Sequence, residues 1–389
     1  MDIDAPEILV AGGGIGGLAA ALALSRQGAA VQLIEQAAAF SEVGAGIQIG
    51  PNVTRILREW GLEAGLREVA SFPHELVARD ARSGRELGRL TLGERAERLY
   101  GAPYACIHRA DLHQLLLAAA QAQGVPLHLG QRLTEVQAQT DAVTIRTEQG
   151  LVCQPALLVG ADGLWSHSRQ ALGLTEAPGF SGHLAYRGLV PLGEPLPTPQ
   201  VTVWMGPRLH VVLYPVQAGR ALNVVAIVHG DMPTNPKDWD HGAHAAQLLQ
   251  ALGPISRPLR QTLESVPQWR LWALNDRPPL SAAQQMGQGA VALLGDAAHP
   301  MRPYLAQGAG MAIEDAQVLA QCWADGGSLA ERVQRYAELR WRRNARVQAR
   351  AIRNGRIFHA QGPLSWGRNL AMGMLGAQVM DVPWLYRGL

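Results

Sequence analysis

A glycine-rich turn near the N-terminus constrains the fold of this chain more than any other feature. A short apolar run, Ile8–Ala11, leads into the sequence GGGIGG, and a stretch of small residues with helical character follows. In the pattern G-x-G-x-x-G, Gly12 permits a tight turn, Gly14 lets a pyrophosphate approach the backbone, and Gly17 lets the helix pack on the strand. The pattern predicts the opening strand, turn and helix of a Rossmann-like α/β fold.

An acidic residue stands at the expected distance from this turn. The second apolar stretch, residues 30–34, ends at Glu35. An acid about 20 residues beyond the glycines accepts hydrogen bonds from ribose hydroxyls, and its charge disfavours a 2′-phosphate. The alternative is an ordinary flexible glycine turn, which the flanking strand, helix and acid make the weaker interpretation.

Residues 295–316, GDAAHPMRPYLAQGAGMAIEDA, form a second corner of this kind. A buried strand is predicted at 290–295, Asp296 follows it, and a helix is predicted to begin near Gly310. The Asp296 carboxylate can accept hydrogen bonds from sugar or ribityl hydroxyls. The backbone N–H groups of Gly308, Ala309 and Gly310 can face an electron-rich ring edge at the helix start.

The third corner is Asp162-Gly163, which follows the apolar strand predicted at 157–160. In this order the three corners resemble those of the single-component FAD aromatic hydroxylases, the group A flavoprotein monooxygenases. The resemblance spans residues 8 to about 320. The stretches GAGIQIGPN (44–52), HRADLHQLL (108–116) and PYLAQGAG (303–310) are most similar to the branch with 3-hydroxybenzoate 6-hydroxylase and salicylate hydroxylase.

This resemblance implies a cofactor, a co-substrate and a reaction. Tightly bound FAD is expected, with NADH or NADPH as a transient co-substrate, because the chain holds a single dinucleotide fingerprint. A C4a-hydroperoxyflavin formed with O2 would then hydroxylate a small phenolic acid. A flavin-dependent epoxidase or dehydrogenase, and a non-catalytic FAD-binding partner protein, remain alternatives. The ring position, decarboxylation, the choice of NADH or NADPH and the oligomeric state stay open.

Three residues are predicted to contact the substrate: His210, Tyr214 and Gln307, to which the resemblance assigns this role. In the strand predicted at 209–214, His210 and Tyr214 point to one face and lie about 13 Å apart. Activation of a phenol calls for a group that titrates near neutral pH, and His210 is the leading candidate. The alternative is a core histidine, with Tyr214 as packing.

Two further residues are predicted near the cofactor. Arg109 lies just before a predicted helix (111–123) that Asp111 could cap, and the family places a pyrophosphate-binding arginine there. Gln48, in a glycine-rich loop, could reach the flavin edge or the substrate.

Other residues have weaker indications. His299 is interpreted as a structural member of the GDAAHP turn. Tyr186 and Arg187 could meet a carboxylate or simply pack. Relatives commonly carry glycine and asparagine where this chain has Ala306 and Gly310, so contacts to the flavin pyrimidine edge are expected to differ in detail.

The composition favours a globular enzyme without a nucleic-acid or membrane partner. The 389 residues are 48% hydrophobic, and 34 basic and 32 acidic residues give a net charge of +2. Three cysteines share no CxxC or metal spacing, so free thiols, no metal site and a cytoplasmic location are predicted. A small aromatic acid and O2 are the expected small-molecule partners.

The expected fold class is α/β, with a Rossmann-like FAD-binding domain interleaved with a smaller β-sheet substrate domain, plus C-terminal helices. The FAD-binding domain is assigned 1–75, 104–175 and 275–330, the substrate domain 76–103 and 176–274, and the C-terminal helical segment 331–389. An arginine-rich helix in that last segment, with arginines at 340, 342, 343, 346, 350, 353 and 356, is interpreted as a solvated face or a subunit contact in a possible homodimer, rather than as a surface for nucleic acid or anionic lipid.

Overall fold

The computed structural model describes residues 6–40, 45–139, 142–232, 241–243 and 245–388. The chain divides into two compact units. Unit 1 comprises residues 1–42, 112–179 and 276–351, and unit 2 comprises 43–111, 180–275 and 352–389. Residues 43–75 and 104–111 therefore fall outside the unit that holds the glycine fingerprint. The last predicted segment is shared between the units and forms no body of its own.

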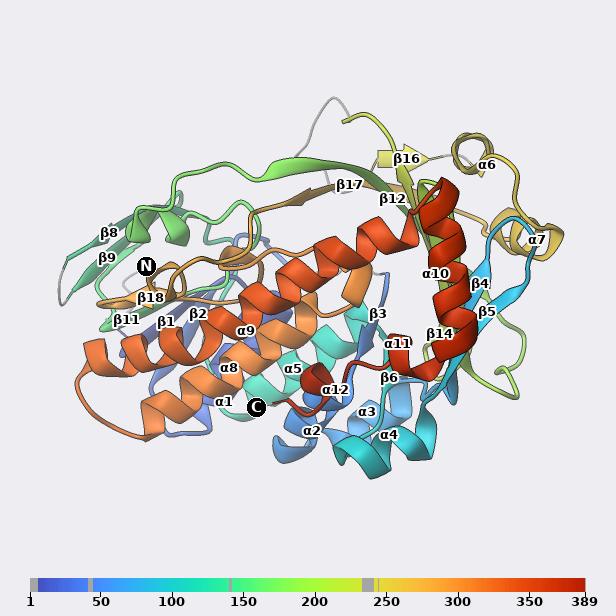
Figure 1. The fold of residues 1–389 in the computed structure, drawn as a ribbon. Coiled ribbons are helices and arrows are strands. Elements are labelled where there is room, and N and C mark those ends of the chain that lie inside the picture. Colours follow the sequence, from blue (N-terminus) through green and yellow to red (C-terminus); the bar gives the residue numbers. More distant parts are fainter. Residues whose placement is uncertain (1–5, 41–44, 140–141, 233–240, 244, 389) are drawn as a thin grey trace. The chain divides into compact units, whose positions relative to one another are not determined.

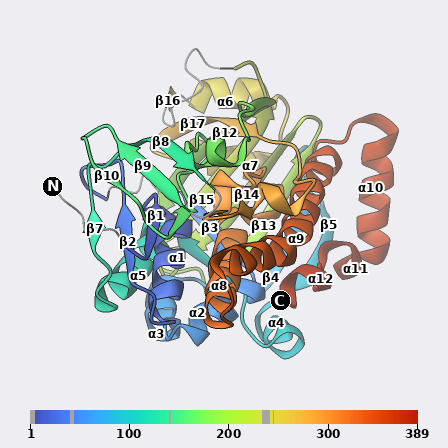
Figure 2. The same cartoon turned by 90° about the vertical axis from the view of Figure 1, so that its left-hand side faces the viewer.

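Unit 1 has a parallel sheet with the order β18-β19-β11-β1-β2-β7, in which β18 is antiparallel to its neighbour. Its strands are β1 (Ile8–Ala11), β2 (Val31–Ile34), β7 (Leu127–His128), β8 (Leu133–Ala138), β9 (Val143–Thr147), β10 (Val152–Cys153), β11 (Leu157–Gly160), β18 (Gly287–Gln288) and β19 (Val291–Leu293). Its helices are α1 (Ile15–Ser25), most of α5 (Arg109–Ala122), α8 (Gly308–Ala324) and most of α9 (Leu329–Phe358). Strands β8, β9 and β10 form a separate sheet, and α1 and α5 lie on the opposite side of the parallel sheet from it (Figures 1 and 2).

The buried positions explain these elements. Strand β1 is buried at all four positions, as expected for a parallel strand covered on both faces. Helix α1 is buried around most of its circumference, and its alanines and glycines allow the close approach of α8 along its length. Strands β8 and β9 pair as an antiparallel hairpin, whereas Leu127 and His128 pair in parallel with β2.

Unit 2 is built on a mixed sheet with the order β16-β17-β12-β15-β14-β13-β4-β5. Its strands are β3 (Gly46–Ile49), β4 (Glu75–Asp80), β5 (Glu86–Thr91), β6 (Ala105–His108), β12 (Gly179–Pro191), β13 (Gln200–Gly206), β14 (Leu209–Val216), β15 (Ala221–His229), β16 (His241–Ala243) and β17 (Trp269–Asp276). Its helices are α2 (Pro51–Glu59), α3 (Glu63–Val69), α4 (Gly93–Tyr100), α6 (Ala245–Leu252), α7 (Arg257–Glu264), α10 (Gly362–Leu375), α11 (Ala377–Met380) and α12 (Pro383–Tyr386).

The two faces of this sheet differ in character. On one face, Leu209, Val211 and Tyr186 pack with leucines of α6 and α7 in an apolar core. Strand alternation and register place another set on the opposite face, called here the histidine face: His183, Arg187, His210, Tyr214, Asn223 and His229. Among the described residues, no helix is long and apolar enough to cross a membrane.

Candidate functional site

The three glycine-and-acid corners meet at one edge of the unit 1 sheet. Strand β11 pairs in parallel with β1 on one side and with β19 on the other. The carboxyl ends of parallel neighbours share an edge, which is where α/β sheets bind ligands. The turns after β1, β11 and β19 therefore lie side by side, although hundreds of residues separate them in sequence.

The first corner has the geometry that its glycines predict. Gly12 has a φ of +109°, and a Cβ on Gly17 would lie 1.8 Å from the Gly12 carbonyl oxygen. A Cβ on Gly14 would meet nothing within 4 Å, so space is open beside this backbone. The turn and packing roles of Gly12 and Gly17 are thus confirmed, and Gly14 leaves room for a ligand.

Glu35 braces the same turn. Its carboxylate accepts hydrogen bonds from the backbone N–H of Gly13 at 2.6 Å and of Ala37 at 2.8 Å. A carboxylate has about four acceptor positions, so these two bonds leave capacity for a ribose hydroxyl. The turn has a second brace that sequence reasoning missed, because the ring nitrogen Nε2 of His113 lies 2.8 Å from the Gly13 carbonyl oxygen. His113 belongs to the HRADLHQLL stretch, and this stretch is the sequence signal from which its role could have been inferred.

Asp162 organises the second corner. Its carboxylate accepts hydrogen bonds from the Ser166 hydroxyl at 2.6 Å and from the backbone N–H groups of His167 and Ser168. Arg169 then donates to the carbonyl oxygens of Ala297 and Ala298 at 2.9 Å. The second corner therefore holds the third corner in place, and Asp162 acts at least partly by shaping its own turn.

The third corner presents a carboxylate and a helix start. Asp296 is exposed between the buried residues Gly295 and Ala297. Helix α8 begins at Gly308, two residues before the predicted start, and the side chain of Gln307 immediately before it is buried. The first N–H groups of a helix have no acceptor within the helix, so Gly308, Ala309 and Gly310 offer donors and partial positive charge.

His299 belongs to a buried network, as its structural interpretation predicts. Its Nε2 lies 2.5 Å from the Asp315 carboxylate, and Asp315 also accepts a hydrogen bond from Arg340 at 2.7 Å. Arg340 bonds Glu314 as well and is fully buried. Burial alone would raise the pKa of Asp315, but the charges of His299 and Arg340 outweigh it and lower that pKa.

The interpretation of the arginine-rich helix as a solvated face is wrong for Arg340. This arginine lies on the inner side of α9 and ties it to α8, whereas Arg342, Arg346, Arg353 and Arg356 are exposed. Sequence spacing alone could not separate them, because α9 is rich in arginine on several sides.

In unit 2, His210 and Tyr214 share the histidine face, which confirms the predicted alternation. The hydroxyl of Tyr214 donates to the Gly46 carbonyl oxygen at 2.6 Å, while the Asn223 side chain accepts the Gly46 N–H at 2.6 Å. A Cβ at Gly46 would collide with both side chains. Burial raises the pKa of Tyr214, so its hydroxyl stays protonated and donates.

Gln48 follows on the same short strand, β3. Its side-chain oxygen accepts a hydrogen bond from the Tyr104 hydroxyl at 2.7 Å, and a hydrogen bond from Gln48 also lowers the pKa of Tyr214. Gln48, Tyr104 and Tyr214 thus form one polar group at this end of the histidine face.

His210 lies at the other end, among histidines. It is 1% exposed, and its Nδ1 lies 2.8 Å from Nε2 of His359. Burial, with a smaller contribution from His183, lowers the pKa of His210 to about 3. His210 is therefore neutral at pH 7 in this structure, in contrast to the near-neutral titration expected from its proposed role.

One arginine of unit 2, Arg187, has an incomplete set of hydrogen-bond partners among the described residues. Arg187 lies on the histidine face, its guanidinium carbon is 5.1 Å from the centre of the Trp272 ring, and its Nε has no hydrogen-bond partner among the described residues. Burial lowers the pKa of Arg187, and the charge of Arg109 lowers it further. Tyr186, by contrast, packs in the apolar core, so only Arg187 of this pair could meet a carboxylate.

Arg109 is the first residue of α5, and its backbone N–H donates to the Ala45 carbonyl oxygen. The helix therefore begins before Asp111, which lies in its first turn and is not its cap. A cap role for Asp111 is thus wrong.

Comparisons with known proteins agree with this geometry. A family described as "FAD binding domain" matches residues 6–358. The chain is 37% identical to 3-hydroxybenzoate 6-hydroxylase of Polaromonas naphthalenivorans over 97% of its length and 95% of the relative. It is 37% identical to a 3-amino-4-hydroxybenzoate 2-monooxygenase of Streptomyces platensis, over 98% and 96%. A solved salicylate hydroxylase substrate complex superimposes with a TM-score of 0.79 at 25% identity, covering 99% of this chain and 98% of that one.

The chain belongs to this FAD-binding family. It is an FAD-dependent aromatic monooxygenase with the mixed α/β fold of the family, as the resemblance of its three corners predicted. The non-catalytic alternative is thereby set aside.

The residues of unit 1 fit the cofactor of this family. Open space at Gly14 suits a pyrophosphate, exposed Asp296 suits a ribityl hydroxyl, and the start of α8 suits the electron-rich edge of the flavin. Ala306, in the turn before α8, has a φ of +51°, a left-handed conformation that glycine adopts more readily than alanine. The strained turn before α8 is thus kept without the residue best suited to it.

Proposed function

We propose that this FAD-dependent monooxygenase hydroxylates a small phenolic acid of the hydroxybenzoate type, consuming NAD(P)H and O2. The observation that carries the proposal is Arg187, a partly buried guanidinium on the same sheet face as Tyr214 and His210. An anion beside Arg187 would relieve its repulsion by Arg109 and bond its Nε. The relatives described above act on aromatic acids that also carry a hydroxyl group, which supports the same substrate class.

We assign the roles of the chain's residues as the family resemblance implies. FAD is bound by Gly12, Gly14, Gly17, Glu35, Gln48, Arg109, Asp162, Asp296, Gly308, Ala309 and Gly310. The flavin, when bound, supplies the redox and oxygen chemistry, which the family resemblance assigns to a C4a-hydroperoxyflavin. His210, Tyr214 and Gln307 contact the substrate, and His210, neutral at pH 7, is a hydrogen-bond partner of the phenol oxygen.

Product analysis tests this function. Purified enzyme is supplied with NADH or NADPH, 18O-labelled O2 and a panel of hydroxybenzoates. One labelled oxygen atom in a phenolic product, with matched loss of reduced nicotinamide, is the expected result. Unlabelled product or epoxide would favour the dehydrogenase or epoxidase alternative.

Two variants test the assigned residues with different readouts. His210→Ala is expected to slow hydroxylation or to divert reduced nicotinamide into peroxide, while FAD content is unchanged. Arg187→Gln is expected to raise KM for the acid about tenfold or more, because a charge-assisted hydrogen bond contributes about 1.5–3 kcal/mol. The matching phenol without a carboxylate serves as the control, since its KM should not depend on Arg187. Equal losses for both compounds would remove Arg187 from carboxylate binding.

Two further assignments accompany this function. We propose a homodimer, because Leu364, Trp366, Leu370 and Met374 of α10 are 65–77% exposed and monomers rarely expose such a group of large apolar side chains. We also propose a cytoplasmic location, which the three buried, free cysteines support. Recovery of the protein in an extracellular or periplasmic fraction would contradict that location.

A further inference from the structure

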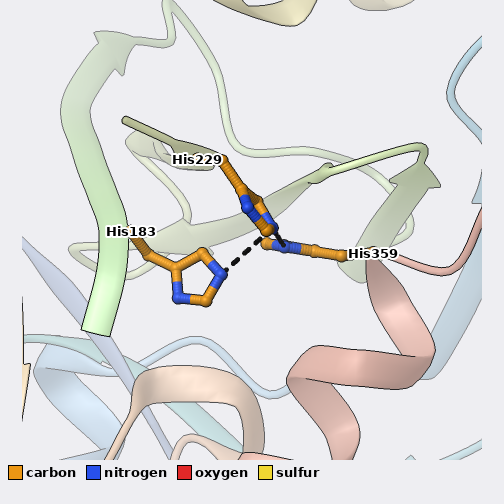
Figure 3. Close-up of side chains that lie close together, drawn as sticks. All are labelled: His183, His229 and His359. Atoms are coloured by element: carbon orange, nitrogen blue, oxygen red, sulfur yellow. Dashed lines mark hydrogen bonds between the residues drawn. The ribbon is translucent and has the colours of Figure 1, made fainter. Parts of the chain in front are cut away.

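Three histidines converge on the histidine face of unit 2 (Figure 3). His183 of β12 and His229 of β15 are direct partners across the two antiparallel strands, with their Nε2 atoms 3.1 Å apart. His359 immediately follows α9, and its Nδ1 lies 3.0 Å from Nε2 of His229. Elements far apart in the sequence thus bring three ring nitrogens to one point.

Hydrogen bonds among the three rings cannot satisfy all of these ring nitrogens at once. Each imidazole nitrogen carries either one N–H or one lone pair in the ring plane. Nε2 of His229 faces two nitrogens at hydrogen-bond distance, yet it can complete only one direct N–H···N bond. An ion that accepts lone pairs from all three nitrogens removes this conflict.

We propose that His183, His229 and His359 bind a divalent transition-metal ion, with Zn2+ as the reference ion. One ring nitrogen of each histidine lies within 4.8 Å of the others. The contacts between the rings make Nε2 of His183, Nε2 of His229 and Nδ1 of His359 the ligand atoms. Tetrahedral zinc with Zn–N bonds of about 2.0–2.1 Å needs ligand nitrogens about 3.3 Å apart. The two close contacts at His229 would therefore open slightly, and the nitrogens of His183 and His359, within 4.8 Å of each other, would settle at the same spacing. Imidazole suits zinc, copper, nickel and iron.

The surroundings orient the ligands. Nε2 of His359 is held at 2.8 Å by Nδ1 of His210, the partner a metal-binding imidazole needs on its other nitrogen. The backbone N–H of Arg208 donates to the His359 carbonyl oxygen and fixes the chain just beyond α9. His183 is 9% and His359 7% exposed, whereas His229 is partly exposed and leaves access for the ion and for water as a fourth ligand.

Such an ion would act as a structural link within unit 2. It would tie the residue after α9 to strands β12 and β15. This structural role differs from the proposed hydroxylation, although His210 takes part in both. The site revises the prediction of no metal site, which considered cysteine spacing alone.

Metal binding to the FAD-loaded enzyme tests the proposal. Chelator-treated protein is titrated with Zn2+ by calorimetry in a buffer that does not bind metals, and zinc content is measured after dialysis. One ion per chain is expected, with a rise in the unfolding temperature. His183→Gln and His229→Gln should each weaken binding at least tenfold, since lost ligands cost no less than lost outer partners.

His128→Gln is the matched control. His128 is a partly buried histidine of unit 1 that bonds the Gln32 side chain, and its loss should leave zinc binding unchanged. Absence of saturable binding to the unmodified enzyme would overturn the proposal, as would equal affinity in His229→Gln. Flavin absorbance and circular dichroism, recorded on each sample, separate this outcome from loss of FAD or of folding.

Discussion

Ala306 adopts a left-handed backbone conformation in the turn before α8, with φ +51° and ψ +39°. This conformation costs an alanine about 1–2 kcal/mol, although glycine loses part of that advantage through its greater freedom when unfolded. Ala306→Gly is therefore expected to raise the free energy of unfolding by about 0.5–1 kcal/mol. Urea unfolding followed by circular dichroism measures the change.

Ala349→Gly is the matched control for this substitution. Ala349 is exposed in the middle of α9, where glycine should lower stability by about 1 kcal/mol. If both variants lost stability alike, the turn at Ala306 would not carry the strain described.

Single residues also show how far a motif predicts a role. Gly12 and Gly17 act as predicted, because their roles depend on backbone geometry within a few residues. Glu35 and Asp162 are also occupied in bracing turns, which depends on neighbours such as Ser166 that no spacing rule identifies. The contacts of these acids with FAD stay predictions.

At the scale of elements, helices α8 and α9 are joined by a buried ionic network around Asp315. The pKa of Asp315 is lower in the folded protein than its ordinary value of 3.8 in the unfolded chain. The ionised carboxylate therefore stabilises the fold at pH values above 3.8, and this stabilisation is lost as the pH falls from 3.8 toward the folded pKa. Asp315→Asn leaves Arg340 with one carboxylate fewer and is expected to cost about 3 kcal/mol at pH 7. The unfolding temperature of the variant should also fall less steeply than that of the parent below about pH 4.

Calorimetry between pH 7 and pH 3 measures both effects. Asp325→Asn is the control, because this exposed carboxylate next to the end of α8 faces Arg335 at 3.7 Å and such pairs contribute little. If the unfolding temperature fell equally steeply with decreasing pH in Asp315→Asn and in the parent, Asp315 would not be the group that titrates.

Strand β14 illustrates what an element's pattern predicts. Alternation alone places His210 and Tyr214 on one face, and Leu209 and Val211 on the other. It does not predict that His359, 149 residues later in the sequence, lies within hydrogen-bond distance of His210, because that contact depends on where α9 ends.

At the scale of the whole molecule, the apolar face of α10 is the proposed contact between two copies of the chain. Closed twofold dimers are the commonest homo-oligomers, and interface centres favour tryptophan and methionine. Trp366→Glu is expected to convert a dimer into a monomer at micromolar concentration, as measured by light scattering after size exclusion.

Glu97→Gln is the corresponding control. Glu97 is exposed on α4, a helix drawn apart from α10 in Figures 1 and 2, and its substitution should leave the mass unchanged. A monomeric parent protein would contradict the dimer outright, whereas a dimeric Trp366→Glu variant would exclude α10 as its interface.

The sequence by itself determined the features that depend on nearby residues: the three glycine-and-acid corners, the strands that carry them, the α/β class and the FAD-binding family. These features are local because turn geometry and strand alternation are determined by residues within a few positions of one another. Only the tertiary structure decided which arginine of α9 is buried, that His113 and Arg169 brace the corners, and that histidines of β12, β15 and the end of α9 converge. Each of these depends on how distant segments pack, and side-chain packing has no fixed spacing along the chain.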